Sequence, residues 1–131
     1  MSHEPVVVWE SDREWETWQE EDVAQRGLVY WRTLISGGVT QSEELTMGIA
    51  KIGPGEALNA HHHRQAEIYL ILEGNGMVRI DSASRSVEAG TALFIPGGAV
   101  HSCKNTGTSE LRIAYVLAAD SFDDVEYVFE D

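Results

Sequence analysis

The sequence has little of several features that would place it in particular classes of protein. A single cysteine, Cys103, among 131 residues excludes an internal disulfide and is typical of a reducing compartment. No hydrophobic run reaches the length that a membrane-spanning helix requires. The first ten residues contain no lysine or arginine, so they do not resemble a secretory signal, and we expect a cytoplasmic protein.

Basic residues are also scarce, with 9 Lys and Arg against 22 Asp and Glu and a net charge of −13. Such a charge repels phosphate backbones and anionic lipids, so neither nucleic acid nor a membrane surface is an expected partner. The acidic residues gather in residues 10–22 and 120–131, which we interpret as solvated ends. The length predicts a single domain, residues 1–131, with a helical or extended N-terminal segment (1–26) and a barrel (27–131).

The N-terminal segment has the pattern of a short helix. Ser11 and Glu14 have the spacing of a capping box, and Trp15 and Trp18 would share one helix face. We therefore predict a helix over residues 12–20, with both tryptophans packed on the body of the domain.

The rest of the chain is typical of an antiparallel β protein. Segments rich in β-branched and aromatic residues alternate with glycine-rich turns, which favours a sandwich or small barrel over a βαβ fold. We expect breaks at residues 73–76, 82–86, 96–98 and 106–108. The predicted strands are 28–35, 45–52, 67–72, 76–80, 92–95, 100–105 and 111–117, with a further candidate at 125–129. The apolar stretch from Val29 to Trp31 is a candidate for pairing with a second copy, so we expect a homodimer.

Four of the five histidines lie at two places, residues 61–63 and residue 101. Side chains alternate along a strand, so His61, His63 and Glu67 share one face, whereas His62 points the other way and is expected at the rim. His101 could reach the same place from a distant strand. Imidazole and carboxylate ligands suit a divalent first-row metal ion, so these residues form a candidate metal site.

Two longer motifs resemble the cupin superfamily. Residues 55–74 have its first pattern (G, five residues, HxH, three residues, E, six residues, G), and residues 90–105 have its second (G, five residues, PxG, two residues, H, three residues, N). The resemblance implies an all-β, double-stranded β-helix (jelly-roll) barrel. It also implies that one Fe, Mn, Ni, Co or Zn ion is bound by His61, His63, Glu67 and His101.

Tyr69 lies two residues after Glu67 and should enter the same cavity. A nearby cation favours its phenolate, which makes Tyr69 a candidate base. Residues 61–69 and 123–127 resemble the small cupins that cleave dimethylsulfoniopropionate to acrylate and dimethyl sulfide. That resemblance implies that Tyr69 is the base and that Tyr127 lines the pocket.

Three other side chains have plainer expected roles. Cys103 has the parity of His101, so we expect a small buried side chain rather than a reactive thiol. Asn105 is expected to bond the backbone of a turn. His3 is expected to be exposed near the terminus.

The leading hypothesis is a metal-dependent lyase that acts by β-elimination on a small carboxylate-bearing molecule. An Fe(II)-dependent dioxygenase could use the same ligands. A sugar isomerase or epimerase, and a sensor or binding module without turnover, also remain open, because the cupin fold does not fix the function.

Overall fold

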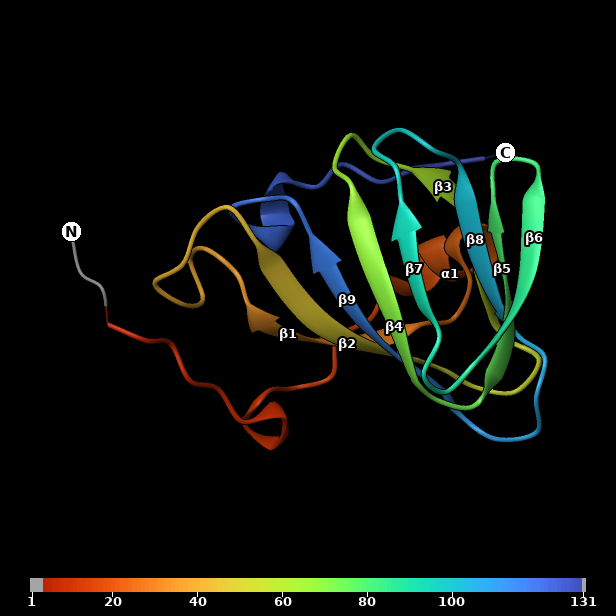
Figure 1. The fold of residues 1–131 in the computed structure, drawn as a ribbon, viewed down its shortest axis with the longest axis horizontal. Coiled ribbons are helices and arrows are strands. Elements are labelled where there is room, and N and C mark those ends of the chain that lie inside the picture. The colour runs from red at the N-terminus through yellow and green to blue at the C-terminus, as the bar shows by residue number, and fades with distance from the viewer. Residues whose placement is uncertain (1–3, 131) are drawn as a thin grey trace.

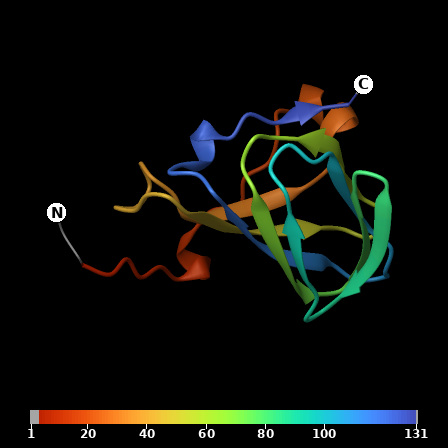
Figure 2. The same ribbon diagram turned by 45° about the horizontal axis from the view of Figure 1, so that its top comes forward.

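The protein is built from two antiparallel five-stranded sheets that face each other (Figures 1 and 2). The computed structural model describes residues 4–130. One sheet has the order β1-β2-β9-β4-β7 and the other the order β10-β3-β8-β5-β6. The strands are β1 (Tyr30–Ile35), β2 (Thr46–Ile52), β3 (Ala57–His62), β4 (Glu67–Glu73), β5 (Asn75–Ile80), β6 (Ala83–Glu88), β7 (Ala92–Ile95), β8 (His101–Asn105), β9 (Leu111–Leu117) and β10 (Val128–Phe129).

The core lies between the sheets and follows the alternation of side chains along the strands. In β4, Glu67, Tyr69 and Ile71 are buried, whereas Ile68 and Leu70 between them are exposed. The same alternation holds in β8, where Cys103 is buried between two more accessible neighbours. These observations confirm the predicted all-β barrel.

Two strands were missing from the sequence prediction. β3 (Ala57–His62) contains Asn59 and polar histidines, so its composition does not mark a strand. β6 (Ala83–Glu88) spans much of the predicted break at 82–86, and almost all its side chains are exposed. Both strands form because a neighbouring strand supplies hydrogen-bond partners, β8 for β3 and β5 for β6.

The predicted helix over residues 12–20 is wrong in position. The helical elements are short: η1 (Glu10–Asp12), η2 (Glu20–Asp22), α1 (Val23–Arg26) and η3 (Phe122–Asp124). Between η1 and η2 the chain is extended, and Glu16 exchanges two backbone hydrogen bonds with Trp31, of 2.7 and 3.0 Å. In an extended chain, residues three apart face opposite ways, so Trp18 packs on Trp31 while Trp15 faces the outer surface. A nine-residue helix is marginal alone, and these tertiary contacts outweigh its capping box.

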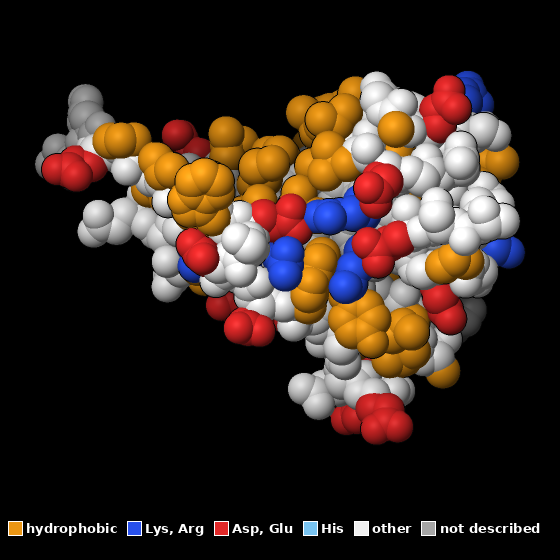
Figure 3. All heavy atoms as spheres, turned by 90° about the horizontal axis from the view of Figure 1, so that it is seen from below, with side chains coloured by type: hydrophobic (Ala, Val, Ile, Leu, Met, Phe, Trp, Pro, Cys, Tyr) orange, Lys and Arg blue, Asp and Glu red, His pale blue; other side chains and the backbone are white. Residues whose placement is uncertain are grey.

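Cationic side chains hold Trp15 on this outer surface. Lys51 Nζ lies 4.0 Å from the centre of the Trp15 ring and Arg32 Cζ lies 4.3 Å from it. Glu10 pairs with Arg32 at 2.9 Å and with Arg112 at 2.6 Å. Figure 3 shows Lys and Arg side chains gathered among hydrophobic side chains and carboxylates on one face. The N-terminal segment is thus fastened to β1, β2 and β9 by charged contacts at the surface.

The edge of β1 is partly used within the chain itself. Val29 and Trp31 are buried, and the backbone of Trp31 is paired with Glu16. Homodimerisation through this stretch remains a prediction. Among the described residues, no helix is both long and apolar enough to cross a membrane. His3 lies outside the described residues.

Candidate metal centre

The predicted ligands come together where the two sheets meet at one end of the barrel. His61 in β3 lies directly opposite His101 in β8. His63 follows the end of β3, and Glu67 begins β4 in the other sheet. All four side chains are buried, so strands far apart in sequence place one polar cluster inside the protein.

A glycine turn brings the two sequence motifs into contact. The backbone N–H of Gly98 donates a 2.8 Å hydrogen bond to the His63 carbonyl. A Cβ at Gly97 would lie 2.3 Å from the Arg64 carbonyl oxygen, closer than real Cβ atoms approach. The turn before His101 can therefore pack on the turn after His63 only with glycine at position 97.

Main-chain carbonyls orient the three imidazoles. Each Nδ1 lies within hydrogen-bond distance of a carbonyl oxygen two residues away in the sequence: 2.8 Å from His61 to Asn59, 3.0 Å from His63 to Gln65 and 2.9 Å from His101 to Ala99. A protonated Nδ1 that donates to a carbonyl leaves the Nε2 lone pair of a neutral ring free for a metal.

The inner ring nitrogens fit a shared ligand. The ligand atoms of His61, His63 and His101 lie within 4.8 Å of one another. The buried Nε2 atoms of His61 and His101 have no hydrogen-bond partner of good geometry. Glu67 Oε1 lies 3.2 Å from His63 Nε2 and 3.4 Å from His101 Nε2. Buried nitrogens of this kind are costly unless they are satisfied, so three histidines with an adjacent carboxylate can hold a divalent metal ion.

The protonation states also suit metal binding. Burial, reinforced by His101, lowers the pKa of His61 to about 3, so this imidazole is neutral at physiological pH. Burial alone would raise the pKa of Glu67, but His101 and His63 beside it outweigh that effect and lower the pKa below 4.5. The cluster therefore presents a neutral imidazole and an ionised carboxylate.

Neighbouring side chains follow the other sequence expectations. His62 is half-buried and lies outside the cluster. Asn105 Nδ2 donates to the carbonyls of Ile52 and Ser109, at 2.8 Å each, which ties down the turn after β8. Cys103 is buried, and burial raises the pKa of its thiol to about 12, so it is a packing residue.

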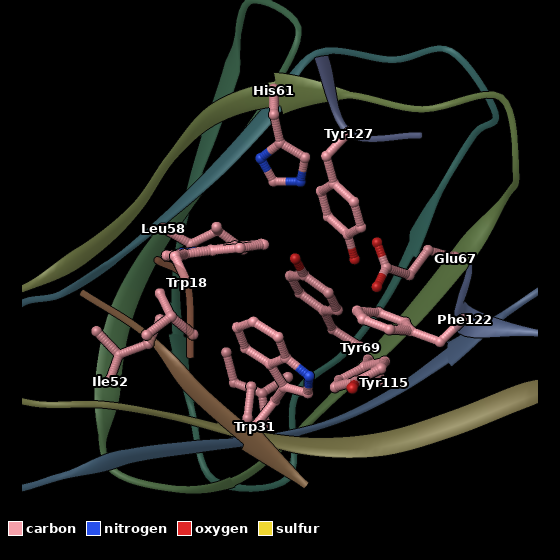
Figure 4. Close-up of a pocket in the computed structure, with 13 residues that line it drawn as sticks. Trp18, Trp31, Ile52, Leu58, His61, Glu67, Tyr69, Tyr115, Phe122 and Tyr127 are labelled. Carbon is pink, nitrogen blue, oxygen red and sulfur yellow. The ribbon is translucent and has the colours of Figure 1, made fainter. Parts of the chain in front are cut away.

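An apolar pocket adjoins the cluster, and both predicted tyrosines line it (Figure 4). The hydroxyl groups of Tyr69 and Tyr127 point into the space beside Glu67. Tyr69 comes from β4, and its ring centre lies 6.3 Å from that of His101. Tyr127 precedes β10, and its ring centre lies 5.2 Å from those of His61 and His63.

The rest of the pocket wall was missed from the sequence. Four more aromatic side chains line it: Trp18, Trp31, Tyr115 and Phe122. Tyr115 could have been found, because it lies opposite Tyr69 in the β4–β9 pairing and shares the buried parity of β9. Trp18 lies in an extended segment outside the strands and Phe122 begins the three-residue η3, so no sequence periodicity indicates the direction of either side chain.

The Cupin domain family matches residues 48–117, a segment that contains all four predicted ligands. The chain belongs to this family. Dimethylsulfoniopropionate lyase DddW of Ruegeria pomeroyi is 46% identical to it over 103 residues, which cover 79% of this chain and 67% of DddW. An oxalate-binding protein of Thermotoga maritima is 29% identical over 93 residues, which cover 70% of this chain and 77% of the relative.

Solved cupin structures have the same fold. A predicted oxalate decarboxylase from Thermotoga maritima superposes with a TM-score of 0.74 at 26% identity, over 87% of this chain and 99% of that one. A cupin-2 domain from Rhodospirillum rubrum gives a TM-score of 0.79 at 19% identity, over 100% of this chain and 83% of that one. The second likeness bears on the fold alone.

Proposed function

We propose that this chain is a metal-dependent lyase that cleaves dimethylsulfoniopropionate, or a closely related β-substituted acid, by β-elimination. The observation that carries the proposal is the 46% identity to dimethylsulfoniopropionate lyase DddW over most of the chain. The pocket supports it, because the tyrosine suggested as the base lies beside the histidine cluster.

His61, His63, His101 and Glu67 would hold the metal ion, and this donor set suits first-row divalent ions such as iron, manganese, nickel, cobalt or zinc. When bound, such an ion supplies positive charge that attracts a substrate carboxylate and lowers the pKa of a nearby phenol. The buried carboxylate of Glu67 balances part of that charge.

Tyr69 would remove the proton from the carbon next to the carboxylate. The C–H electron pair forms the second bond of the new carbon–carbon double bond. The carbon–sulfur bond breaks, and its own electron pair stays on sulfur. The products are acrylate and neutral dimethyl sulfide, and Tyr69 then returns the proton to water. Burial, reinforced by the charge of Glu67, raises the pKa of Tyr69 well above 10 in the metal-free protein. Tyr69 therefore needs nearby positive charge to act as a base.

Tyr127 would close the same space from the C-terminal segment. Its ring packs on those of His61 and His63, and burial raises its pKa well above 10. We assign it the role of a neutral hydroxyl that orients the substrate beside Glu67.

The binding-module alternative is favoured by the oxalate-binding relative. Among the described residues that line the pocket, however, none is a lysine or arginine. A dicarboxylate would find no second cation there, so the pocket is better suited to a substrate with one carboxylate.

The test is to load the protein with each of the five ions in turn and supply dimethylsulfoniopropionate. Acrylate and dimethyl sulfide should appear in equal amounts, without oxygen consumption. Turnover that consumes oxygen would support the dioxygenase alternative. Binding without acrylate from any loaded form would contradict the lyase.

A further inference from the structure

The four proposed metal ligands are enclosed by the protein. His61, His63, Glu67 and His101 are each at most 4% exposed, so a metal ion needs a path to them between neighbouring side chains. A divalent ion hydrated by six waters occupies roughly 200 Å³, at about 30 Å³ per water. The apolar pocket beside His61 and Glu67 measures about 40 Å³ and is walled largely by aromatic rings, so it is too small for such an ion.

A second cavity reaches the cluster from the surface, beside the C-terminal segment. It measures about 310 Å³, and buried His63 lines it together with more exposed side chains. The cavity lies where the C-terminal segment runs along β3, since Val128 in β10 pairs with His62 in β3 and both line the cavity (Figures 1 and 2). Its volume exceeds that of the hydrated ion, so an ion can approach His63 with its waters in place.

The wall of this second cavity is charged. Asp124 and Glu126 line it, and both are exposed. Within residues 4–130 neither carboxylate forms an ion pair, although Arg64 also lines the cavity. Both carboxylates belong to the acidic segment 120–131, which therefore passes the histidine cluster instead of ending free in solvent. Carboxylates at the mouth of a cleft raise the local concentration of cations and the rate at which they enter.

Gln65 connects the exposed carboxylates to the buried histidines. Its Nε2 donates one long hydrogen bond, of 3.4 Å, to the carbonyl of Asp124, and its own carbonyl lies 3.0 Å from His63 Nδ1. The side chain of Gln65 lines the cavity and is only 8% exposed, yet its Oε1 has no hydrogen-bond partner. A buried amide oxygen without a partner is costly, and amide oxygens are ligands of divalent cations. Gln65 therefore offers a cation an oxygen ligand next to His63.

We propose that this second cavity is the path by which a divalent metal ion enters the buried cluster. Asp124 and Glu126 attract the hydrated ion, and Gln65 Oε1 ligates it before it reaches His63. Because a path lowers the barrier in both directions, these three residues set the rates of metal uptake and release, whereas the cluster sets the equilibrium affinity. The inference rests on the proposed function only for the metal ion itself.

Stopped-flow mixing of metal-free protein with Co²⁺ tests the path. Quenching of tryptophan fluorescence gives the uptake rate constant, a chelator chase gives the release rate constant, and competition with a chelator at equilibrium gives the dissociation constant. The double variant Asp124→Asn/Glu126→Gln should take up Co²⁺ about 5- to 50-fold more slowly at low ionic strength, and the difference should shrink as salt is added. The dissociation constant should change by much less than the uptake rate constant.

Matched substitutions separate the cavity wall from the charge of the whole chain. Asp123→Asn makes the same change of charge as Asp124→Asn in the same segment, but Asp123 does not line this cavity, so it should leave the uptake rate unchanged. Arg64→Gln removes the opposing charge and should raise the rate. Gln65→Leu keeps the size of the side chain without its oxygen and should slow uptake and release equally. Circular dichroism checks that each variant is folded.

Uptake at the wild-type rate in either the double variant or Gln65→Leu would overturn the path. Equal slowing by Asp123→Asn and Asp124→Asn would also overturn it, as would wild-type protein that takes up no Co²⁺. Acrylate release is measured separately on fully loaded protein, so the two proposals can fail independently. Acrylate together with unchanged uptake in the variants would refute the path and leave the lyase standing. Slowed uptake without acrylate from any loaded form would support the path and contradict the lyase.

Discussion

Two parts of the site are held by different kinds of structure: the cluster of His61, His63, His101 and Glu67 (the histidine end), and the rings of Trp18 and Phe122 that pack on Trp31 (the aromatic end). The histidines and Glu67 lie on or beside paired strands, and main-chain carbonyls fix each imidazole. Trp18 and Phe122 project from segments outside the strands and are held by ring contacts. The directions of the side chains at the histidine end follow from alternation along strands. Those at the aromatic end depend on how the segments before β1 and after β9 pack on the barrel.

The largest expected effect is loss of the metal on removal of one imidazole. His63→Ala should lower the metal affinity by more than about 100-fold. The barrel should stay folded, because the core between the sheets does not depend on His63. Elemental analysis and circular dichroism measure the two quantities. His62→Ala, one residue away and outside the cluster, should retain the metal. Unfolding of His63→Ala would instead indicate a structural metal.

The next largest effect is expected on the rate of the chemical step, with the metal retained. Tyr69→Phe should reduce acrylate release by about 10²- to 10⁴-fold, because it removes the base. Its metal content should not change, since the phenol is not among the proposed ligands. Steady-state kinetics and elemental analysis on the same sample decide the matter. Unchanged kinetics would remove Tyr69 from the mechanism.

The histidine end should also make the stability of the metal-free protein depend on pH. The pKa of His61 is about 3 in the folded chain, against 6.5 for an ordinary histidine. Between these values the unfolded state binds the additional proton, so stability falls as the pH falls. The free energy of unfolding should fall by about 2 kcal/mol between about pH 7 and pH 5, above the range in which Glu67 titrates.

Urea denaturation at several pH values, with a chelator present, measures this slope. His61→Gln should flatten it, and His62→Gln should not. An equal slope in wild type and His61→Gln would contradict the burial of a neutral imidazole at position 61.

The smallest effect is expected where the N-terminal segment is fastened at the surface. Glu10→Gln removes the charge that pairs with Arg32 and Arg112, and partly exposed pairs contribute little. The free energy of unfolding should fall by less than about 1 kcal/mol. A thermal melt against wild type tests this. A loss of several kcal/mol would mean that the segment is as firmly held as the strands.

Much of the histidine end could be predicted from the sequence. Period-two alternation placed His61, His63, Glu67 and Tyr69 on one buried face and left His62 outside the cluster. Alternation is local, because a strand fixes the direction of each side chain. His101 comes from a distant strand, and its place beside the others was implied by the resemblance to the cupin motifs.

The aromatic end could not be predicted in the same way. The capping box before Trp15 favoured a helix, but backbone pairing of Glu16 with Trp31 and the packing of Trp18 favour an extended chain. Both are tertiary contacts with residues more than ten positions away. β3 and β6 were missed for a related reason, since their partners rather than their own residues make them strands.

The most direct test of the central claim is a titration of metal-free protein with its activating ion while acrylate release from dimethylsulfoniopropionate is followed. We expect no acrylate at the start and a linear rise to a plateau at one ion per chain. His101→Ala should give no rise over the same range. Full acrylate release from metal-free protein, or none with any of the five ions, would contradict the account.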